Sequence, residues 1–358
     1  MRKKLLLAAL SVFTVCAMTA CGKEDDDKTE AVTTAATTAA VTTEAPTEAP
    51  TTEAPTTEAP TEAPSTEEPV SEEEDEENYE TGDASLDNPR NADEIGENEI
   101  LVVSFGTSYN DSRRLTIGAI EEAIEKAYPD WSVRRAFTSD IIINHIKNRD
   151  GEVIDSLDEA LERAEKNGVK NLVIQPTHLM NGYEYEDVLK ALAKHEGFET
   201  VTIGDTLLAK DEYFERVAKI LADTMSKYDD GETAICFMGH GTEHESNAVY
   251  AKMQETFKNL GYENFYVGTV EAEPSFQDVV DTVAAAGKYK KVVLRPLMVV
   301  AGDHANNDMA GDEDDTWKSL FVNAGFEVET DISGLGELEE IQKMYVEFAG
   351  NSIESLAK

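Results

Sequence analysis

The chain has 358 residues, of which 73 are Asp or Glu and 31 are Lys or Arg, so its formal net charge at pH 7 is −42. A phosphate backbone repels so acidic a chain, and we therefore expect no nucleic-acid partner. The charge is unevenly spread, because residues 22–99 hold 25 acidic and 3 basic residues, whereas residues 100–358 hold 48 and 25. The second part has the length and composition of a folded body of about two domains.

Residues 1–21 are predicted to be an export signal. A basic head at 2–4 precedes an apolar run over about 5–17, which is too short for a comfortable bilayer span. Residues 18–21, MTAC, resemble the lipobox of bacterial lipoproteins, which implies cleavage before Cys21 and a diacylglycerol on its thiol. The protein is then exported and anchored by this lipid to the outer face of the bacterial cell membrane. An ordinary signal peptide with an incidental cysteine is the alternative.

The remaining cysteine, Cys236, has no partner for an intramolecular disulfide once Cys16 is removed and Cys21 is lipidated. It lies within an apolar run over 234–238. This setting favours a small buried thiol over a reactive one.

Residues 22–98 are predicted to be a disordered, acidic linker. The repeat Thr-Glu-Ala-Pro occurs five times between residues 43 and 64, and an acidic run covers 71–77. So few large apolar residues cannot offset the entropy of ordering the backbone, and proline with like-charge repulsion extends the chain. The segment therefore reads as a tether, and deletion of 22–95 is expected to leave the activity of the folded body unchanged.

From residue 99 onward, short apolar runs rich in β-branched residues alternate with amphipathic stretches. Strands are predicted at 100–105, 131–137, 171–176, 200–204, 233–238, 264–269, 290–299 and 326–330. Helices are predicted at 112–127, 155–167, 184–195, 211–227, 245–260, 275–286, 313–323 and 337–349. This alternation indicates an α/β fold with parallel sheets that helices cover on both faces.

A faint internal repeat divides this body into two similar lobes, predicted at 99–229 and 230–358. Residues 170–176, with Gly182 six positions after the proline, mirror residues 290–296, with Gly302 six positions after theirs. The repeat predicts two three-layer αβα lobes. Because ligands bind beyond the carboxyl ends of parallel strands, we expect the active site in a cleft between the lobes.

Three residues of the second lobe that could bind a metal ion follow successive strands. His240 closes the first strand in Met-Gly-His-Gly-Thr, Glu271 follows the second, and His304 follows the third. Two imidazoles and one carboxylate suit a borderline divalent ion. Their spacings form no local motif, so ordinary loop residues that make hydrogen bonds are the alternative.

The other histidines carry weaker predictions. His178 follows a strand of the first lobe and is a candidate for the opposite wall of the cleft. His244 is expected at an exposed helix start, with a residue that supports the metal ligands as the alternative. His145 and His195 lie on polar helical stretches and are expected at the surface. No phosphate-binding glycine loop follows a strand, so the sequence does not indicate ATP or a dinucleotide.

The folded part resembles the sirohydrochlorin cobaltochelatase family of anaerobic cobalamin synthesis, which belongs to the ATP-independent class II tetrapyrrole chelatases. The resemblance covers about 98–350. The matching blocks are 103–108, 135–139, 178–186, 238–241, 270–271 with Pro274, 296–305 with 307–309, and 334–337.

This resemblance implies that His240, Glu271 and His304 hold the metal ion and that a tetrapyrrole, sirohydrochlorin, binds in the cleft. Co²⁺ is the implied substrate metal, with Fe²⁺ or Ni²⁺ as alternatives, and no organic cofactor is needed. We assign His240 as the catalytic proton acceptor. The candidates for binding substrate, including its carboxylates, are Gly106, Thr107, Ser108, Arg113, Arg114, Arg135 and His178. Ordinary surface ion pairing is the alternative for each arginine.

A second interpretation comes from another class of protein. A lipid-anchored, tethered, bilobal chain could instead be a cell-surface lipoprotein that binds haem, another tetrapyrrole or a metal ion and delivers it to a transporter. The intact set of His, Glu and His favours the enzyme. Homo-oligomers are compatible with the sequence.

Overall fold

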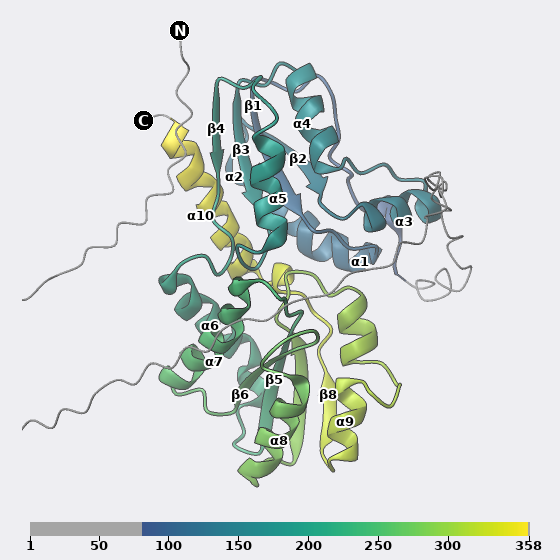
Figure 1. Cartoon of the computed structure of the whole chain (residues 1–358), viewed down its shortest axis with the longest axis vertical. Coiled ribbons are helices and arrows are strands. Elements are labelled where there is room, and N and C mark those ends of the chain that lie inside the picture. The colour runs from purple at the N-terminus through teal and green to yellow at the C-terminus, as the bar shows by residue number, and fades with distance from the viewer. Residues whose placement is uncertain (1–80, 357–358) are drawn as a thin grey trace, which may run out of the picture. The chain divides into compact units, whose positions relative to one another are not determined.

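The computed structural model describes residues 81–356 (Figure 1). The predicted export signal, the lipidation site Cys21 and most of the predicted linker lie outside these residues. Within the described part, no helix combines the length and the apolar character that crossing a bilayer requires.

All eight predicted strands are present, with bounds that differ from the prediction by three residues at most. They are β1 Asn98–Ser104, β2 Ser132–Phe137, β3 Asn171–Pro176, β4 Thr200–Ile203, β5 Thr233–Gly239, β6 Phe265–Thr269, β7 Lys291–Pro296 and β8 Glu327–Thr330. The helices between them are α1 Asn110–Arg113, α2 Ala119–Ala127, α3 Asp140–Asp150, α4 Leu157–Lys166, α5 Tyr183–Leu192, α6 Asp211–Met225, α7 Ala248–Asn259, α8 Phe276–Ala286, α9 Trp317–Asn323 and α10 Glu339–Leu356.

Helix α3 is absent from the predicted set of connecting helices. Its N-cap is Ser139, whose hydroxyl accepts a hydrogen bond from the Ile142 amide, and its C-cap is Gly151, which has a positive φ of 73°. Its sequence is weakly amphipathic, with Ile146 as its buried residue. The helix therefore depends on its end signals more than on an apolar stripe.

The strands form two four-stranded parallel sheets with the same topology, β2-β1-β3-β4 and β6-β5-β7-β8. In each sheet the first strand of the lobe lies in the centre. The central strands are almost completely buried, and β5 is buried along its whole length. This explains why they read as continuous apolar runs, since both faces of such a sheet are covered. The predicted fold of two similar αβα lobes is confirmed.

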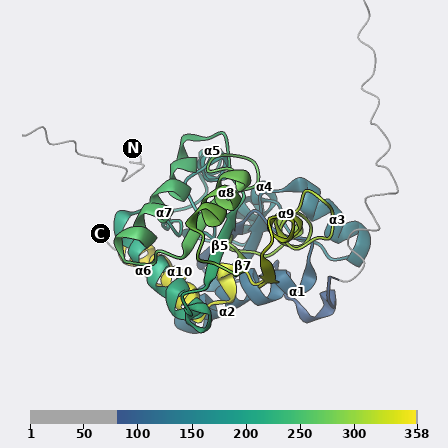
Figure 2. The ribbon, with the colours of Figure 1, turned by 90° about the horizontal axis from the view of Figure 1, so that it is seen from below.

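The helices that cover the sheets are exchanged between the lobes, which corrects the predicted boundary at 229/230. Helix α6 lies in the first lobe by sequence but packs with α7 of the second, whereas the last helix, α10, packs on α2, β3 and β4 of the first (Figure 1). Helices α6 and α10 also touch each other (Figure 2). Residues 211–225 therefore belong to the second lobe, and residues 339–356 to the first.

This exchange gives the two lobes a shared apolar core. One buried cluster runs from Ile100 of β1 through α6 and α10 to Phe237 of β5. Its contact between the exchanged helices joins Tyr213 and Phe348, whose ring centroids are 4.7 Å apart. The lobes are thus parts of one packed unit.

The segment 81–97 is an ordered strap on the first lobe, which corrects the predicted end of the linker at residue 98. Its Asp87 side chain is 3% exposed and accepts hydrogen bonds from Arg113 and Arg135. Its Arg90 forms ion pairs with Glu121 and Glu125 of α2. The sequence did not predict the strap, because ion pairs hold it in place. Sequence patterns reveal elements through the periodicity of their apolar residues, and the strap has none.

Candidate functional site

The three predicted metal ligands come together at the carboxyl edge of the second sheet. One ligand atom from each of His240, Glu271 and His304 lies within 4.8 Å of the others. Their side chains are 45%, 54% and 32% exposed, respectively. A ligand could therefore reach this metal-site trio directly, and the three protein ligands leave coordination positions free.

Backbone hydrogen bonds hold the first two members of the trio side by side. His240 follows β5, and its carbonyl accepts hydrogen bonds from the amides of Val270 and Glu271 just after β6, at 3.1 and 2.9 Å. Gly241 has a φ of +91°, and a Cβ there would lie 2.7 Å from the Ala272 amide nitrogen. The close approach of these two loops thus requires a glycine beside His240.

The loop that carries the third member is held against the first lobe. The Ala301 amide donates to the Ser112 hydroxyl at 3.0 Å. At Gly302, a Cβ would lie 2.9 Å from Thr107 Oγ1. The position of His304 therefore depends on contacts with both lobes.

Both imidazole rings have their Nδ1 atom in a hydrogen bond. Nδ1 of His240 lies 2.8 Å from the Gly241 carbonyl oxygen, and Nδ1 of His304 lies 2.6 Å from Asp308 Oδ2. Carbonyl and carboxylate oxygens only accept, so each Nδ1 is the donor in its contact, and in the neutral ring each Nε2 then keeps a lone pair. The rings meet edge to face, with centroids 4.5 Å apart.

His178 is half-buried in the first lobe, after β3, and was predicted to contact substrate. Its two ring nitrogens are buried and lack a hydrogen-bond partner among the described residues. Burial lowers the pKa of His178 to about 4, against the opposing charge of Glu184. The ring is therefore neutral at pH 7 and can donate one hydrogen bond, but it offers no positive charge to a carboxylate.

The loop of Gly106, Thr107 and Ser108, predicted to bind substrate, follows β1. The carbonyl of Thr107 accepts from Arg113 at 3.3 Å, and that of Ser108 accepts from Arg149 at 2.6 Å. These contacts fix the loop beside Gly302. That its amides bind a substrate carboxylate stays a prediction.

Arg135 and Arg113 are not available to a substrate carboxylate, which corrects the prediction made for them. Both side chains are fully buried. Arg135 pairs with Asp87 and Glu121, and Arg113 pairs with Asp87. Burial opposes ionisation of Asp87, but the two guanidinium groups outweigh it and lower its pKa.

Arg114, the third predicted arginine, is 35% exposed and pairs with Asp111. It is therefore the arginine of the three that keeps some access to solvent.

The remaining predicted residues lie at lobe contacts or in the core. His244 has its Nε2 3.4 Å from Glu186 Oε1, and its ring packs edge-on against Tyr183, so it joins the second lobe to α5 of the first. His244 does stand at a helix start, as the N-cap of the short 3-10 helix Glu245–Asn247, but its side chain is 14% exposed rather than free in solvent. Cys236 is fully buried, as predicted, and burial raises its thiol pKa.

The last two histidines, His145 and His195, were predicted to lie at the surface, and this is confirmed only in part. His145 of α3 is half-buried. The side chain of His195 is 11% exposed, and its Nδ1 lies 3.4 Å from Glu165 Oε2.

Sequence reasoning assigned no role to two residues near these groups, Asp308 and Glu184. The charge of Glu184 acts on both His178 and Tyr250, while burial raises the pKa of Tyr250 to about 12. The internal repeat held a signal for Glu184, because it follows Gly182 by two positions as His304 follows Gly302. The four-residue spacing from His304 was the signal for Asp308.

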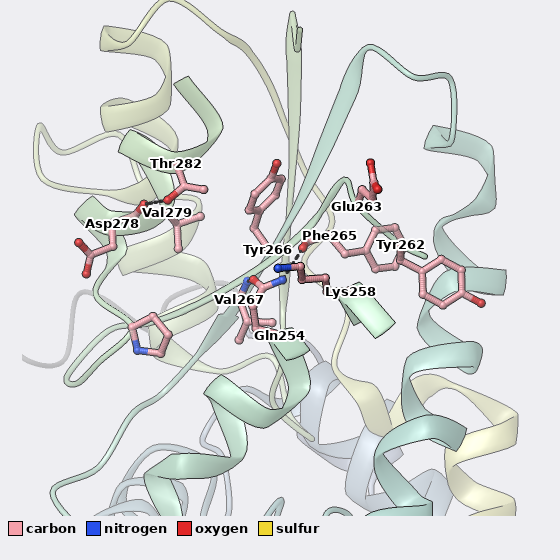
Figure 3. A pocket seen from close by; sticks show the side chains of 11 residues that line it. Gln254, Lys258, Tyr262, Glu263, Phe265, Tyr266, Val267, Asp278, Val279 and Thr282 are labelled. Atoms are coloured by element: carbon pink, nitrogen blue, oxygen red, sulfur yellow. Dashed lines mark hydrogen bonds between the residues drawn. The ribbon is translucent and has the colours of Figure 1, made fainter. Parts of the chain in front are cut away.

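A hollow of about 430 Å³ lies elsewhere in the second lobe, against the edge strand β6 between α7 and α8 (Figure 3). The side-chain amide of Gln254 forms hydrogen bonds with the outer backbone edge of β6. It donates to the Phe265 carbonyl at 2.9 Å and accepts from the Val267 amide at 2.8 Å. None of its lining residues is a member of the metal-site trio.

Comparisons with known proteins identify relatives of the chain. The chain is 37% identical over 248 residues to the sirohydrochlorin cobaltochelatase of Salmonella typhimurium, which covers 69% of this chain and 93% of that protein. It is 27% identical over 260 residues to the sirohydrochlorin cobaltochelatase CbiKC of Nitratidesulfovibrio vulgaris, covering 72% and 91%. The solved structure of SirB from Bacillus subtilis with Fe³⁺ has a similar fold, with a TM-score of 0.50 at 11% identity over 73% of this chain and 99% of that one.

The fold and the trio define a bilobal α/β protein whose second lobe carries ligands suited to a divalent metal ion. Residues 98–354 match the cobalt chelatase (CbiK) family. The chain belongs to this family.

Proposed function

We propose that this protein is a sirohydrochlorin cobaltochelatase, which inserts Co²⁺ into sirohydrochlorin without ATP. The observation that carries the proposal is the convergence of His240, Glu271 and His304 within 4.8 Å, on a chain of the cobalt chelatase family. The two curated relatives with this activity support the choice of substrate.

The trio suits an ion that must be bound and then released. The reaction exchanges two pyrrole N–H protons for one divalent cation. While the ion is on the protein, it would be held by imidazole lone pairs of His240 and His304 and by the Glu271 carboxylate. As it moves to the macrocycle nitrogens, these lone pairs become free, and His240 Nε2 accepts a pyrrole proton. Glu271 or His304 takes the second proton, which balances the exchange.

Exposed apolar side chains on the first lobe support a flat organic substrate. Phe105 follows β1 and is 48% exposed, although the strand before it is buried. Ile141 and Tyr183, which follow β2 and β3, are 82% and 51% exposed. Phe105 lies two residues before Thr107, which contacts the His304 loop. We infer that these side chains cover one face of the macrocycle while the trio addresses its nitrogens.

Absorption spectra of the purified chain mixed with metal-free sirohydrochlorin and Co²⁺ test this function. Many turnovers per protein are expected for the wild type. His240→Ala and His304→Ala are each expected to lower the rate of insertion at least about 100-fold with an unchanged circular dichroism spectrum, because each removes a ligand and a proton acceptor. A spectral shift limited to one equivalent would identify a binding protein instead, and full turnover in the variant that lacks both rings would refute the site.

We further propose that the protein works outside the cell membrane, held by lipid on Cys21. Residues 1–21 and the repeated linker support this, and they lie outside the described residues. Labelling of producing cells with a fatty-acid analogue checks it. The wild-type chain is expected to incorporate the label and Cys21→Ser is not, whereas equal labelling of both would exclude this anchor.

A further inference from the structure

The carboxylate of Asp308 contacts one ring of the metal-site trio. Its Oδ2 lies 2.6 Å from Nδ1 of His304, a distance typical of a strong hydrogen bond to an ionised group. A neutral imidazole in water exchanges its proton between the two nitrogens. Because a carboxylate only accepts, the contact favours the form with hydrogen on Nδ1 and a lone pair on Nε2.

The backbone holds Asp308 in this position. A π-helical turn, Ala305–Met309, begins directly after His304. Ala305 and Met309 are fully buried in the apolar core of the second lobe, on either side of Asp308 in sequence. Both ends of the turn are therefore anchored, which places the Asp308 carboxylate, 44% exposed, beside the ring.

A second acidic residue beside His304 has a different contact. Asp303 is exposed, and its carboxylate accepts a hydrogen bond from the Asn307 side chain at 2.7 Å. It carries the same charge as Asp308, and one of its carboxylate oxygens lies within 4.8 Å of ligand atoms of His304 and Asp308, but it has no hydrogen bond to the ring among the described contacts. The chain thus contains a matched control for the effect of charge.

We propose that Asp308 is a positioning residue that holds His304 in the Nδ1–H form and turns the Nε2 lone pair toward the ion shared with His240 and Glu271. That the ion is the Co²⁺ of the insertion reaction rests on the proposed function. In the other tautomer, an N–H group would face the cation and ligation would fail. Carboxylates in this position at other metal sites contribute about 10- to 100-fold to metal affinity or activity.

The test compares Asp308→Asn with Asp303→Asn, two isosteric changes that each remove one negative charge. In nitrogen-15 spectra of the metal-free purified chain, His304 is expected to show the Nδ1–H form in the wild type and in D303N, and a mixture of tautomers in D308N. Without tetrapyrrole, the Kd for Co²⁺ is expected to rise about 10- to 100-fold in D308N and less than about threefold in D303N. Asp308→Glu, which retains an acceptor, is expected to restore the Nδ1–H signal and most of the affinity.

Equal loss of Co²⁺ affinity in D308N and D303N would overturn the proposal, because the carboxylate would then act through its charge. An unchanged His304 tautomer in D308N, or a wild-type ring in the Nε2–H form, would overturn it as well. If D308N does not fold, the Asp308→Glu variant provides the test. Loss of the Nδ1–H form of His304 in that variant would overturn the proposal. A chain that binds Co²⁺ as expected but inserts none would contradict the proposed function and leave this inference intact.

Discussion

The fold buries the carboxylate of Glu99 and provides few polar contacts to replace its lost hydration. Neither of its oxygens has a hydrogen-bond partner among the described residues, and the nearest ion-pair contact, from Arg134, is 3.7 Å long. Burial raises the pKa of Glu99 to about 7, because the attraction of Arg134 is too weak to offset the loss of hydration. The folded state therefore keeps this proton at a pH where the unfolded chain has released it.

The sign of the resulting pH dependence follows from linkage. Between pH 4.5 and about 7 the unfolded state binds fewer protons at this site than the folded state, so the free energy of unfolding falls as the pH rises. Each pH unit is worth about 1.4 kcal/mol. Glu99→Gln is therefore expected to raise the free energy of unfolding by roughly 1 to 3 kcal/mol at pH 8 and to change it little at pH 4.5.

Urea unfolding at the two pH values measures this difference. Glu97→Gln is the control, because Glu97 is exposed and pairs with Lys170 at the surface, where a change within about 0.5 kcal/mol is expected. Arg134 keeps its 2.8 Å contact with Asp155 in the Glu99 variant. An equal gain at both pH values would show that folding does not raise the pKa of Glu99.

At the residue scale, the sequence predicted the metal-site trio. It did not predict the acidic partners of the buried arginines in the first lobe. His240, Glu271 and His304 each follow a strand, and parallel strands bring their carboxyl ends to one edge, so their meeting follows from topology. Arg135 lies within a strand, and its partner Asp87 lies 48 residues earlier in an acidic segment that showed no apolar pattern. Ion pairs between distant segments leave no periodic signal, and this is why Arg135 was assigned to the substrate.

At the scale of elements, the ordered strap changes the result expected when the linker is deleted. Removal of residues 22–80 is expected to leave the insertion rate in detergent-free buffer unchanged within about twofold. Removal of 22–95 deletes Asp87 and leaves the buried guanidinium of Arg135 without one of its two partners. Breaking a buried pair in this way costs about 3 to 5 kcal/mol.

Thermal unfolding and insertion assays of the two deletions separate these outcomes. The 22–95 deletion is expected to melt well below the 22–80 deletion, and Asp87→Asn in the longer chain is expected to reproduce much of that loss. Equal melting temperatures for both deletions would show that the strap adds no stability. A large loss of turnover on removal of 22–80 would instead give the linker a part in the site.

The elements themselves were predictable because their signals are local. Buried parallel strands read as short apolar runs, and all eight were found; α3 was missed because its stripe is weak. The exchange of α6 and α10 was not predictable from the same patterns. An apolar stripe shows that a helix is covered, but it does not identify the sheet that covers it.

At the scale of the whole molecule, the exchanged helices are expected to make the two lobes unfold as one unit. Phe348 of α10 is 1% exposed and packs on Tyr213 of α6, within the cluster that reaches both sheets. Truncation of a buried phenylalanine costs about 3 to 5 kcal/mol. Phe348→Ala should therefore destabilise the first and the second lobe together, although the residue lies near the end of the chain.

The two tryptophans report on the lobes separately, because Trp131 precedes β2 in the first lobe and Trp317 begins α9 in the second. Urea unfolding is followed by fluorescence in Trp131→Phe and Trp317→Phe backgrounds, each with and without Phe348→Ala. The two reporters are expected to share one midpoint, and Phe348→Ala is expected to lower both midpoints equally. Val322→Ala, at a position that is 52% exposed, is the control and should change either midpoint little. If Trp131 lost its native signal at a lower urea concentration than Trp317, the lobes would be separate folding units, and the shared core would contribute less than its burial indicates.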